Sequence, residues 1–146
     1  MTRRAAILPV LIMIALAPLV PALDPGDGAR GVTLFNQGRL EEAREALERA
    51  VAAGEAGAVE MAVLGMTCTK LGDTDRARRV LEQAKQRDPF SSLVHLGWGT
   101  LFFELGEFQS AYESFELARR LEPGSEQARA GMVASLVNRA IIRYRE

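Results

Sequence analysis

Residues 92–125 read SLVHLGWGTLFFELGEFQSAYESFELARRLEPGS, and residues 58–91 read AVEMAVLGMTCTKLGDTDRARRVLEQAKQRDPFS. The two stretches align over 34 residues without a gap, and the same step reaches back to a third copy near residues 24–57. Five columns are identical in all three copies: Gly31, Gly65 and Gly99; Gly38, Gly72 and Gly106; Ala43, Ala77 and Ala111; Glu48, Glu82 and Glu116; Ala50, Ala84 and Ala118. This register indicates a chain built from stacked copies of one supersecondary unit.

Each copy is predicted to be a helical hairpin. Small residues recur inside helix-like periods, where they allow two helix backbones to approach closely, and large apolar columns fill the adjacent space: Leu34, Cys68 and Phe102, and Leu47, Leu81 and Phe115. Gly38, Gly72 and Gly106 lie between two helical runs and suit the left-handed residue that ends a helix. Pro89 and Pro123 close the second and third copies, because proline cannot continue a helix.

Helices are expected at residues 25–37, 40–53, 57–70, 74–87, 91–104 and 108–121, and no alternation typical of strands occurs. A final helix is expected at 125–144, with Ser125 as its N-cap. Its apolar stripe is expected to cover the last hairpin and comprises Val133, Leu136, Val137, Ala140, Ile141 and Tyr144.

With these positions assigned, the sequence resembles the tetratricopeptide repeat (TPR) family. The third copy matches its pattern at His95, Trp98, Gly99, Phe102, Phe108, Ala111, Phe115, Ala118 and Pro123, and the second at Met61, Leu64, Gly65, Cys68, Ala77, Leu81, Ala84 and Pro89. The first copy departs from the pattern at Arg30 and Glu55. The resemblance implies an all-α, right-handed superhelical solenoid of three hairpins, with repeats near 24–57, 58–91 and 92–125 and a capping helix at 125–144.

The N-terminal segment has the order of an export signal. Residues 5–23 carry no charge and follow Arg3 and Arg4. We expect a signal peptide at 1–22, cleaved after Ala22, with a cut after Ala17 as the second choice. The alternative is an uncleaved membrane anchor, which prolines at three positions of this short segment disfavour.

The TPR domain is then expected at residues 23–146. After export it would be periplasmic or secreted, or it would be held at the inner membrane by residues 1–22 if these are retained. Nothing else in the chain is expected to contact a membrane.

Composition excludes two classes of protein. With 48% apolar and 25% charged residues the chain is not intrinsically disordered, and a formal charge of −1 lacks the basic surface of a nucleic-acid binder. Removing residues 1–22 removes two arginines and no acid, which leaves 16 basic and 19 acidic side chains. Cys68 is the single cysteine, so no intramolecular disulfide can form.

No residues are predicted to be catalytic, to bind a metal or to hold a cofactor, and the protein is not expected to be an enzyme. Cys68 and His95 are the only candidates for a nucleophilic pair, and both lie in packing columns of the repeat. Glycines recur every 34 residues rather than every three or four, so they form no phosphate-binding loop.

A second apolar face on the first helix of each hairpin is the candidate binding site. It recurs through the copies as Val32 and Phe35; Val59, Ala62 and Met66; and Leu93, Leu96, Thr100 and Phe103. In TPR proteins this face lines the concave surface that holds peptides, and members that clamp a C-terminal carboxylate place Lys, Arg and Asn there. The resemblance therefore implies a groove for an apolar or amphipathic segment of another protein.

This pattern predicts a non-catalytic interaction module, an exported adaptor or assembly factor of the cell envelope. The alternative is a homo-oligomer, or a subunit of a larger envelope complex, in which the stripe serves self-assembly. The stripe could also pack against the chain's own N-terminal segment.

Overall fold

The computed structural model describes residues 26–145 of the chain, and the expected signal peptide at 1–22 lies outside the described residues. The described part consists of seven α-helices and contains no strand. In chain order they are α1 (Gly26–Asn36), α2 (Leu40–Ala52), α3 (Ala58–Lys70), α4 (Thr74–Arg87), α5 (Ser92–Glu104), α6 (Phe108–Leu121) and α7 (Glu126–Arg145). Each expected helix is confirmed, with its ends displaced by no more than one residue.

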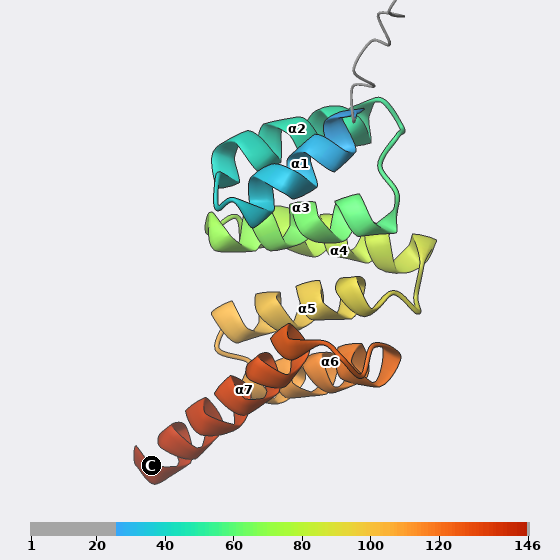
Figure 1. Cartoon of the computed structure of the whole chain (residues 1–146). Helices are drawn as coiled ribbons and strands as arrows, with labels where there is room; N and C mark the ends of the chain where they lie inside the picture. Colours follow the sequence, from blue (N-terminus) through green and yellow to red (C-terminus); the bar gives the residue numbers. More distant parts are fainter. Residues whose placement is uncertain (1–25, 146) are drawn as a thin grey trace, which may run out of the picture.

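The helices form three antiparallel hairpins, α1–α2, α3–α4 and α5–α6, stacked along one axis, with α7 at the end of the stack (Figure 1). The first helices of successive hairpins contact one another, α1 with α3 and α3 with α5. Since second helices run back between them, the first helices all point the same way and line one side of the stack. None of the seven helices has the length and hydropathy that a membrane crossing requires.

Glycine ends the first helix of each hairpin, as the repeat predicts. Gly38, Gly72 and Gly106 have φ of 77°, 82° and 76°, in the left-handed region that glycine adopts without a steric penalty. At the first of these turns, the Gly38 amide donates to the Phe35 carbonyl at 2.9 Å and the Arg39 amide to the Leu34 carbonyl at 3.0 Å. The same pair of bonds recurs at the other two turns, and this Schellman motif satisfies carbonyls that the helix would leave unpaired.

A second set of glycines makes room for large side chains of the neighbouring helix. A Cβ on Gly65 would lie 2.5 Å from Cγ of Leu81, and one on Gly97 would lie 2.6 Å from Cδ2 of the same leucine. Gly99 and Gly131 enclose Phe115 in the same way, each with a ring carbon 2.6 Å from the position of its missing Cβ. Leu81 therefore lies between glycines of α3 and α5, and Phe115 between glycines of α5 and α7, which confirms the glycine column of Gly65 and Gly99 as a site of close approach.

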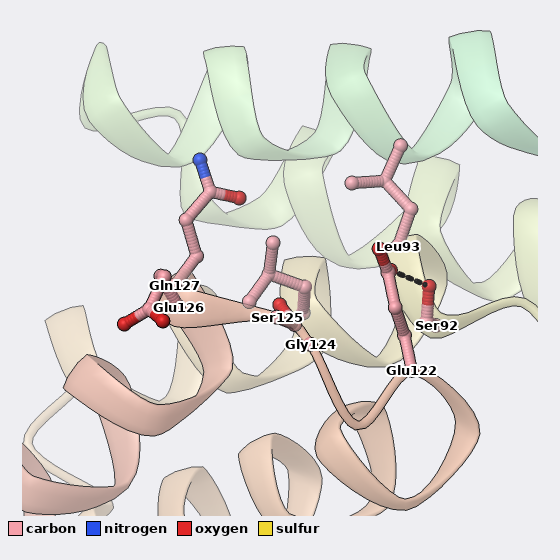
Figure 2. Close-up of a pocket in the computed structure, with 8 residues that line it drawn as sticks. Ser92, Leu93, Glu122, Gly124, Ser125, Glu126 and Gln127 are labelled. Carbon is pink, nitrogen blue, oxygen red and sulfur yellow. Dashed lines mark hydrogen bonds between the residues drawn. The ribbon is translucent and has the colours of Figure 1, made fainter.

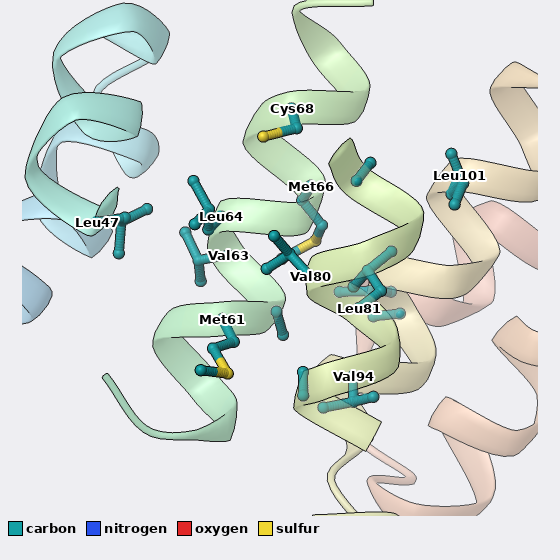
Figure 3. Close-up of a cluster of buried hydrophobic side chains, with 14 of the residues drawn as sticks. Leu47, Met61, Val63, Leu64, Met66, Cys68, Val80, Leu81, Val94 and Leu101 are labelled. Atoms are coloured by element: carbon teal, nitrogen blue, oxygen red, sulfur yellow. The ribbon is translucent and has the colours of Figure 1, made fainter. Parts of the chain in front are cut away.

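Most apolar columns of the repeat form one core (Figure 3), while Leu34, Ala43 and Ala46 form a second, smaller cluster in the first hairpin. Leu47, Leu64, Leu81 and Leu101 are each no more than 1% exposed. Cys68 is fully buried among them, and burial raises the pKa of its thiol to about 11. The thiol is therefore protonated at neutral pH and acts as a small apolar side chain, as its column predicts.

The last helix caps the stack, but the expectation about its buried face was wrong. Ser125 accepts a hydrogen bond from the Ala128 amide at 3.3 Å, which confirms the predicted cap. The helix packs on α6 through Ala128, Gly131 and Ser135 rather than through the large apolar stripe. The stripe was chosen by hydrophobicity, whereas close approach to the Phe115 ring requires small residues.

We predict that Gly65→Ala destabilises the protein by about 1–3 kcal/mol, measured by urea denaturation, because the new methyl overlaps a leucine confined on two sides. An alanine in an unconfined helix interior would instead stabilise by about 1 kcal/mol over glycine.

The control for this prediction is Gly65→Ala combined with Leu81→Ala, which removes the overlap. The double variant should lose less stability than the two single changes added together. A stabilising Gly65→Ala, or strict additivity in the double variant, would contradict the close contact.

A concave apolar cavity as the candidate functional site

The first helices of the three hairpins line a cavity of about 390 Å³ on one side of the stack, the side that is concave in a TPR solenoid. Each of these helices contributes side chains from a single face. Most of the lining is apolar, and the residues are Val32, Phe35 and Asn36 from α1, Val63, Met66 and Lys70 from α3, Leu93, Leu96 and Thr100 from α5, with Phe115 and Gln127. Lys70 is the only charged side chain among them. The cavity therefore offers an apolar surface with few hydrogen-bonding groups.

Six of the nine predicted site residues meet in this cavity: Val32, Phe35, Met66, Leu93, Leu96 and Thr100. The other three, Val59, Ala62 and Phe103, are not among its lining residues. Val59 is 46% exposed at the start of α3, and Ala62 is fully buried, with its carbonyl facing Gly97 across the α3–α5 contact. Phe103 packs edge-to-face on Phe108, with ring centroids 5.2 Å apart, so its side chain serves the α5–α6 hairpin.

The sequence argument missed five lining residues, which are Asn36, Val63, Lys70, Phe115 and Gln127. Asn36 and Lys70 share a column of the repeat. Each is the next member of the same helix face toward the C-terminal end of α1 or α3, so a longer stripe would have included both. Val63 occupies the column of Gly97 and Gly131, so its side chain takes the space that Leu81 and Phe115 fill in the later copies. Phe115 belongs to a second helix and reaches the cavity only because Gly99 and Gly131 lack side chains. Its position depends on tertiary packing, which helix periodicity does not predict.

An adjoining pocket of about 370 Å³ extends this surface to the start of α5 and the α6–α7 loop (Figure 2). It shares Leu93, Leu96 and Gln127 with the apolar cavity. Glu122 and Glu126 also line it, and the Glu122 carboxylate accepts a hydrogen bond of 2.7 Å from the Ser92 hydroxyl. Because Asn36 and Lys70 are the last residues of their helices and Ser92 is the first of its own, the acidic pocket and Lys70 lie toward opposite ends of the concave surface.

The two residues considered for nucleophilic chemistry both lie in the packed interior. Cys68 is fully buried, and His95 is 7% exposed with Nε2 at 2.8 Å from the Pro89 carbonyl oxygen. This contact fixes the imidazole at the start of α5, where the TPR pattern more often has an aromatic ring. Among residues 26–145, no group of three or more His, Cys, Asp or Glu side chains is arranged to hold a metal ion.

Comparison with known proteins agrees with this architecture. Two models described as tetratricopeptide repeat match the chain, at residues 34–97 and 69–126. The second TPR domain of the human RPAP3 protein, solved in complex with the HSP70 peptide SGPTIEEVD, is 30% identical, with a TM-score of 0.62 over 75% of this chain and 92% of that one. The first TPR domain of human RPAP3 is 18% identical, with a TM-score of 0.68 over 78% of this chain and 90% of that one.

Among curated proteins, the cell division cycle protein 27 homolog A of Arabidopsis thaliana is 30% identical over 98 residues. This match covers 67% of the present chain and 14% of the relative, so the likeness concerns the repeats and not the whole of that protein. The two family models, the similar solved structures and the repeated glycine contacts all indicate the same repeat. Residues 34–126 of this chain consist of tetratricopeptide repeats, and the chain belongs to this family.

Proposed function

We propose that this protein binds an apolar or amphipathic segment of another protein along its concave surface and has no catalytic activity of its own. The observation that carries the proposal is the cavity lined by Val32, Phe35, Met66, Leu93 and Leu96. Val32, Phe35 and Leu93 are partly exposed there, while Met66 and Leu96 are buried beneath them, and apolar surface of this kind is stabilised when an apolar partner covers it. TPR domains typically mediate protein–protein interactions, which supports this class of function.

The chemistry of the cavity favours a ligand different from the acidic peptide bound by the RPAP3 domain. The peptide SGPTIEEVD carries two glutamates and ends in an aspartate. In the present chain Lys70 is the single cation among the cavity residues, and Glu122 and Glu126 in the adjoining pocket would repel a carboxylate. We therefore propose a segment whose binding rests on apolar side chains, with its carboxylates, if it has any, directed away from the acidic pocket.

We further propose that the protein works as an exported adaptor or assembly factor of the cell envelope. This rests on the order of Arg3 and Arg4 followed by the uncharged residues 5–23. An adaptor with an apolar groove in this compartment would hold a segment of an envelope protein while that protein assembles or docks.

A photo-crosslinking amino acid placed at Thr100 in the native host should capture a partner protein, because this half-buried side chain lines the cavity. The matched control is the same amino acid at Val59, which lies on α3 outside the cavity and is exposed. Val32→Asp combined with Leu93→Asp should reduce the Thr100 adduct at least about tenfold. Each change removes the apolar contact of the original side chain with the ligand and adds a carboxylate that must be desolvated when the ligand binds. Circular dichroism should show unchanged helicity.

Equal capture from Thr100 and Val59, or an adduct that survives Val32→Asp/Leu93→Asp, would contradict a groove-bound partner. In solution, the peptide SGPTIEEVD should bind at least about tenfold more weakly than the captured segment, because its carboxylates meet Glu122 and Glu126. Tighter binding of SGPTIEEVD would overturn the proposed ligand chemistry.

Export predicts a processed N-terminus. Intact-mass measurement on protein isolated from the host should give a chain that begins at Leu23, or at Pro18 if the second site is used. A chain that retains Arg3 and Arg4 and partitions with membranes would indicate an anchor. The same unprocessed chain in the cytosolic fraction would contradict export.

A further inference from the structure

Helix α7 occupies the place of a first helix in a fourth hairpin. Helices α3, α5 and α7 begin at residues 58, 92 and 126, so they follow the repeat step. Gly131 receives the Phe115 ring of the preceding hairpin just as Gly97 receives Leu81. Within residues 26–145, α7 contacts α6 and α5 and no further helix. The side of α7 on which a hairpin partner would pack is therefore uncovered in the described part of the chain.

That uncovered side carries a concentrated apolar surface. Six large side chains on α7 are between 45% and 95% exposed: Val133, Leu136, Val137, Ile141, Ile142 and Tyr144. All but Ile142 form one stripe with Ala140, on the side of the helix opposite the buried Ala128 and Ser135. The C-terminal half of α7 extends beyond the stacked hairpins, so this stripe is accessible along its length (Figure 1).

We propose that α7 pairs in antiparallel orientation with α7 of a second copy of this chain. The stripe positions 133, 137, 140 and 144 follow the four–three–four spacing with which two helices pack side by side. A two-fold axis between residues 138 and 139 sets Val133 opposite Tyr144, Leu136 opposite Ile141 and Val137 opposite Ala140. A large side chain then faces a smaller one at the ends, and Val137 faces the small Ala140 near the axis, which lets the two helices approach closely.

Charge selects the antiparallel direction. Arg139, Arg143 and Arg145 all lie in the C-terminal half of α7. Parallel pairing would place each of them beside its counterpart, whereas the antiparallel register sets Arg143 opposite Ala134 and Arg145 opposite Met132, which separates these arginines from those of the partner.

A lipid surface is the other class of partner that fits a basic amphipathic helix. The second copy is favoured because, in the N-terminal half of α7, the face opposite the stripe is buried at Ala128, Gly131 and Ser135 against α6, where an interfacial helix would carry charged residues.

Sedimentation velocity of the full chain should show a monomer–dimer equilibrium with a Kd on the order of 1–100 µM, because one helix from each copy supplies the contact, whereas a standard interface takes about 800 Å² per partner. Val137→Asp should weaken dimerisation at least about tenfold, since it buries a carboxylate beside the two-fold axis. The matched control is Phe90→Asp, a change at an exposed aromatic side chain in the α4–α5 connection. A monomer at all concentrations, or association that Val137→Asp leaves unchanged, would overturn the proposal.

Crosslinking tests the direction of pairing. Val133→Cys and Tyr144→Cys proteins should give covalent dimers with a short bismaleimide when mixed and not when treated alone, because identical positions lie at opposite ends of an antiparallel pair. Cys68 is buried, so the wild-type chain serves as the unreactive control. Crosslinking of either variant with itself would contradict antiparallel pairing. A monomer whose binding to anionic vesicles is lost in Val137→Asp would replace the second copy with a lipid surface.

This interface is independent of the concave cavity. Val32→Asp/Leu93→Asp should leave the dimer unchanged, and Val137→Asp should leave the Thr100 crosslink unchanged. Failure of the dimer and failure of groove binding can therefore be told apart.

Discussion

Leu81 and Phe115 each insert between two glycines that belong to successive first helices, and the arrangement of the whole stack depends on this contact. One glycine, Gly65 or Gly99, belongs to the same hairpin as the inserted side chain, so it sets the separation of the two helices within that hairpin. The other, Gly97 or Gly131, belongs to the next unit along the chain and sets the separation between hairpins. A single residue of the second helix thereby couples packing within a repeat to packing between repeats. At the first hairpin, Leu47 packs against one glycine, Gly31, because the second glycine column holds Val63.

The same contact determines the composition of the concave surface. Because glycines remove side chains from the first helices at these levels, Phe115 reaches through to the cavity beside Leu93 and Leu96. The second helices keep their charged residues on the opposite side, where Glu48 on α2 and Arg76 on α4 form an ion pair of 3.0 Å between repeats. Apolar residues on the concave side and charged residues on the convex side are the arrangement of a domain that binds through one face.

The repeat made most of the fold predictable. A glycine that recurs at the same position of all three copies indicates that the fold requires glycine there. The alignment of the copies therefore predicted the helix ends, the left-handed turns and the burial of Cys68. The site was less predictable, because helical periodicity places a residue on a face without showing what packs there. Ala62 and Phe103 share the face of Met66 and Leu96, yet a neighbouring helix covers the first and Phe108 contacts the second. On α7, hydrophobicity indicated the wrong buried face because the fit to Phe115 depends on small side-chain size.

We propose that the glycine contacts present an apolar concave surface and that this surface binds a protein segment. A methyl NMR titration of the protein with the segment captured in the host tests this claim most directly. We expect the methyl signals of Val32, Met66, Leu93 and Leu96 to shift, with intermolecular contacts to the ligand, while those of Val133 and Val137 on α7 stay fixed. Shifts confined to α7, or to the charged second helices, would contradict the account.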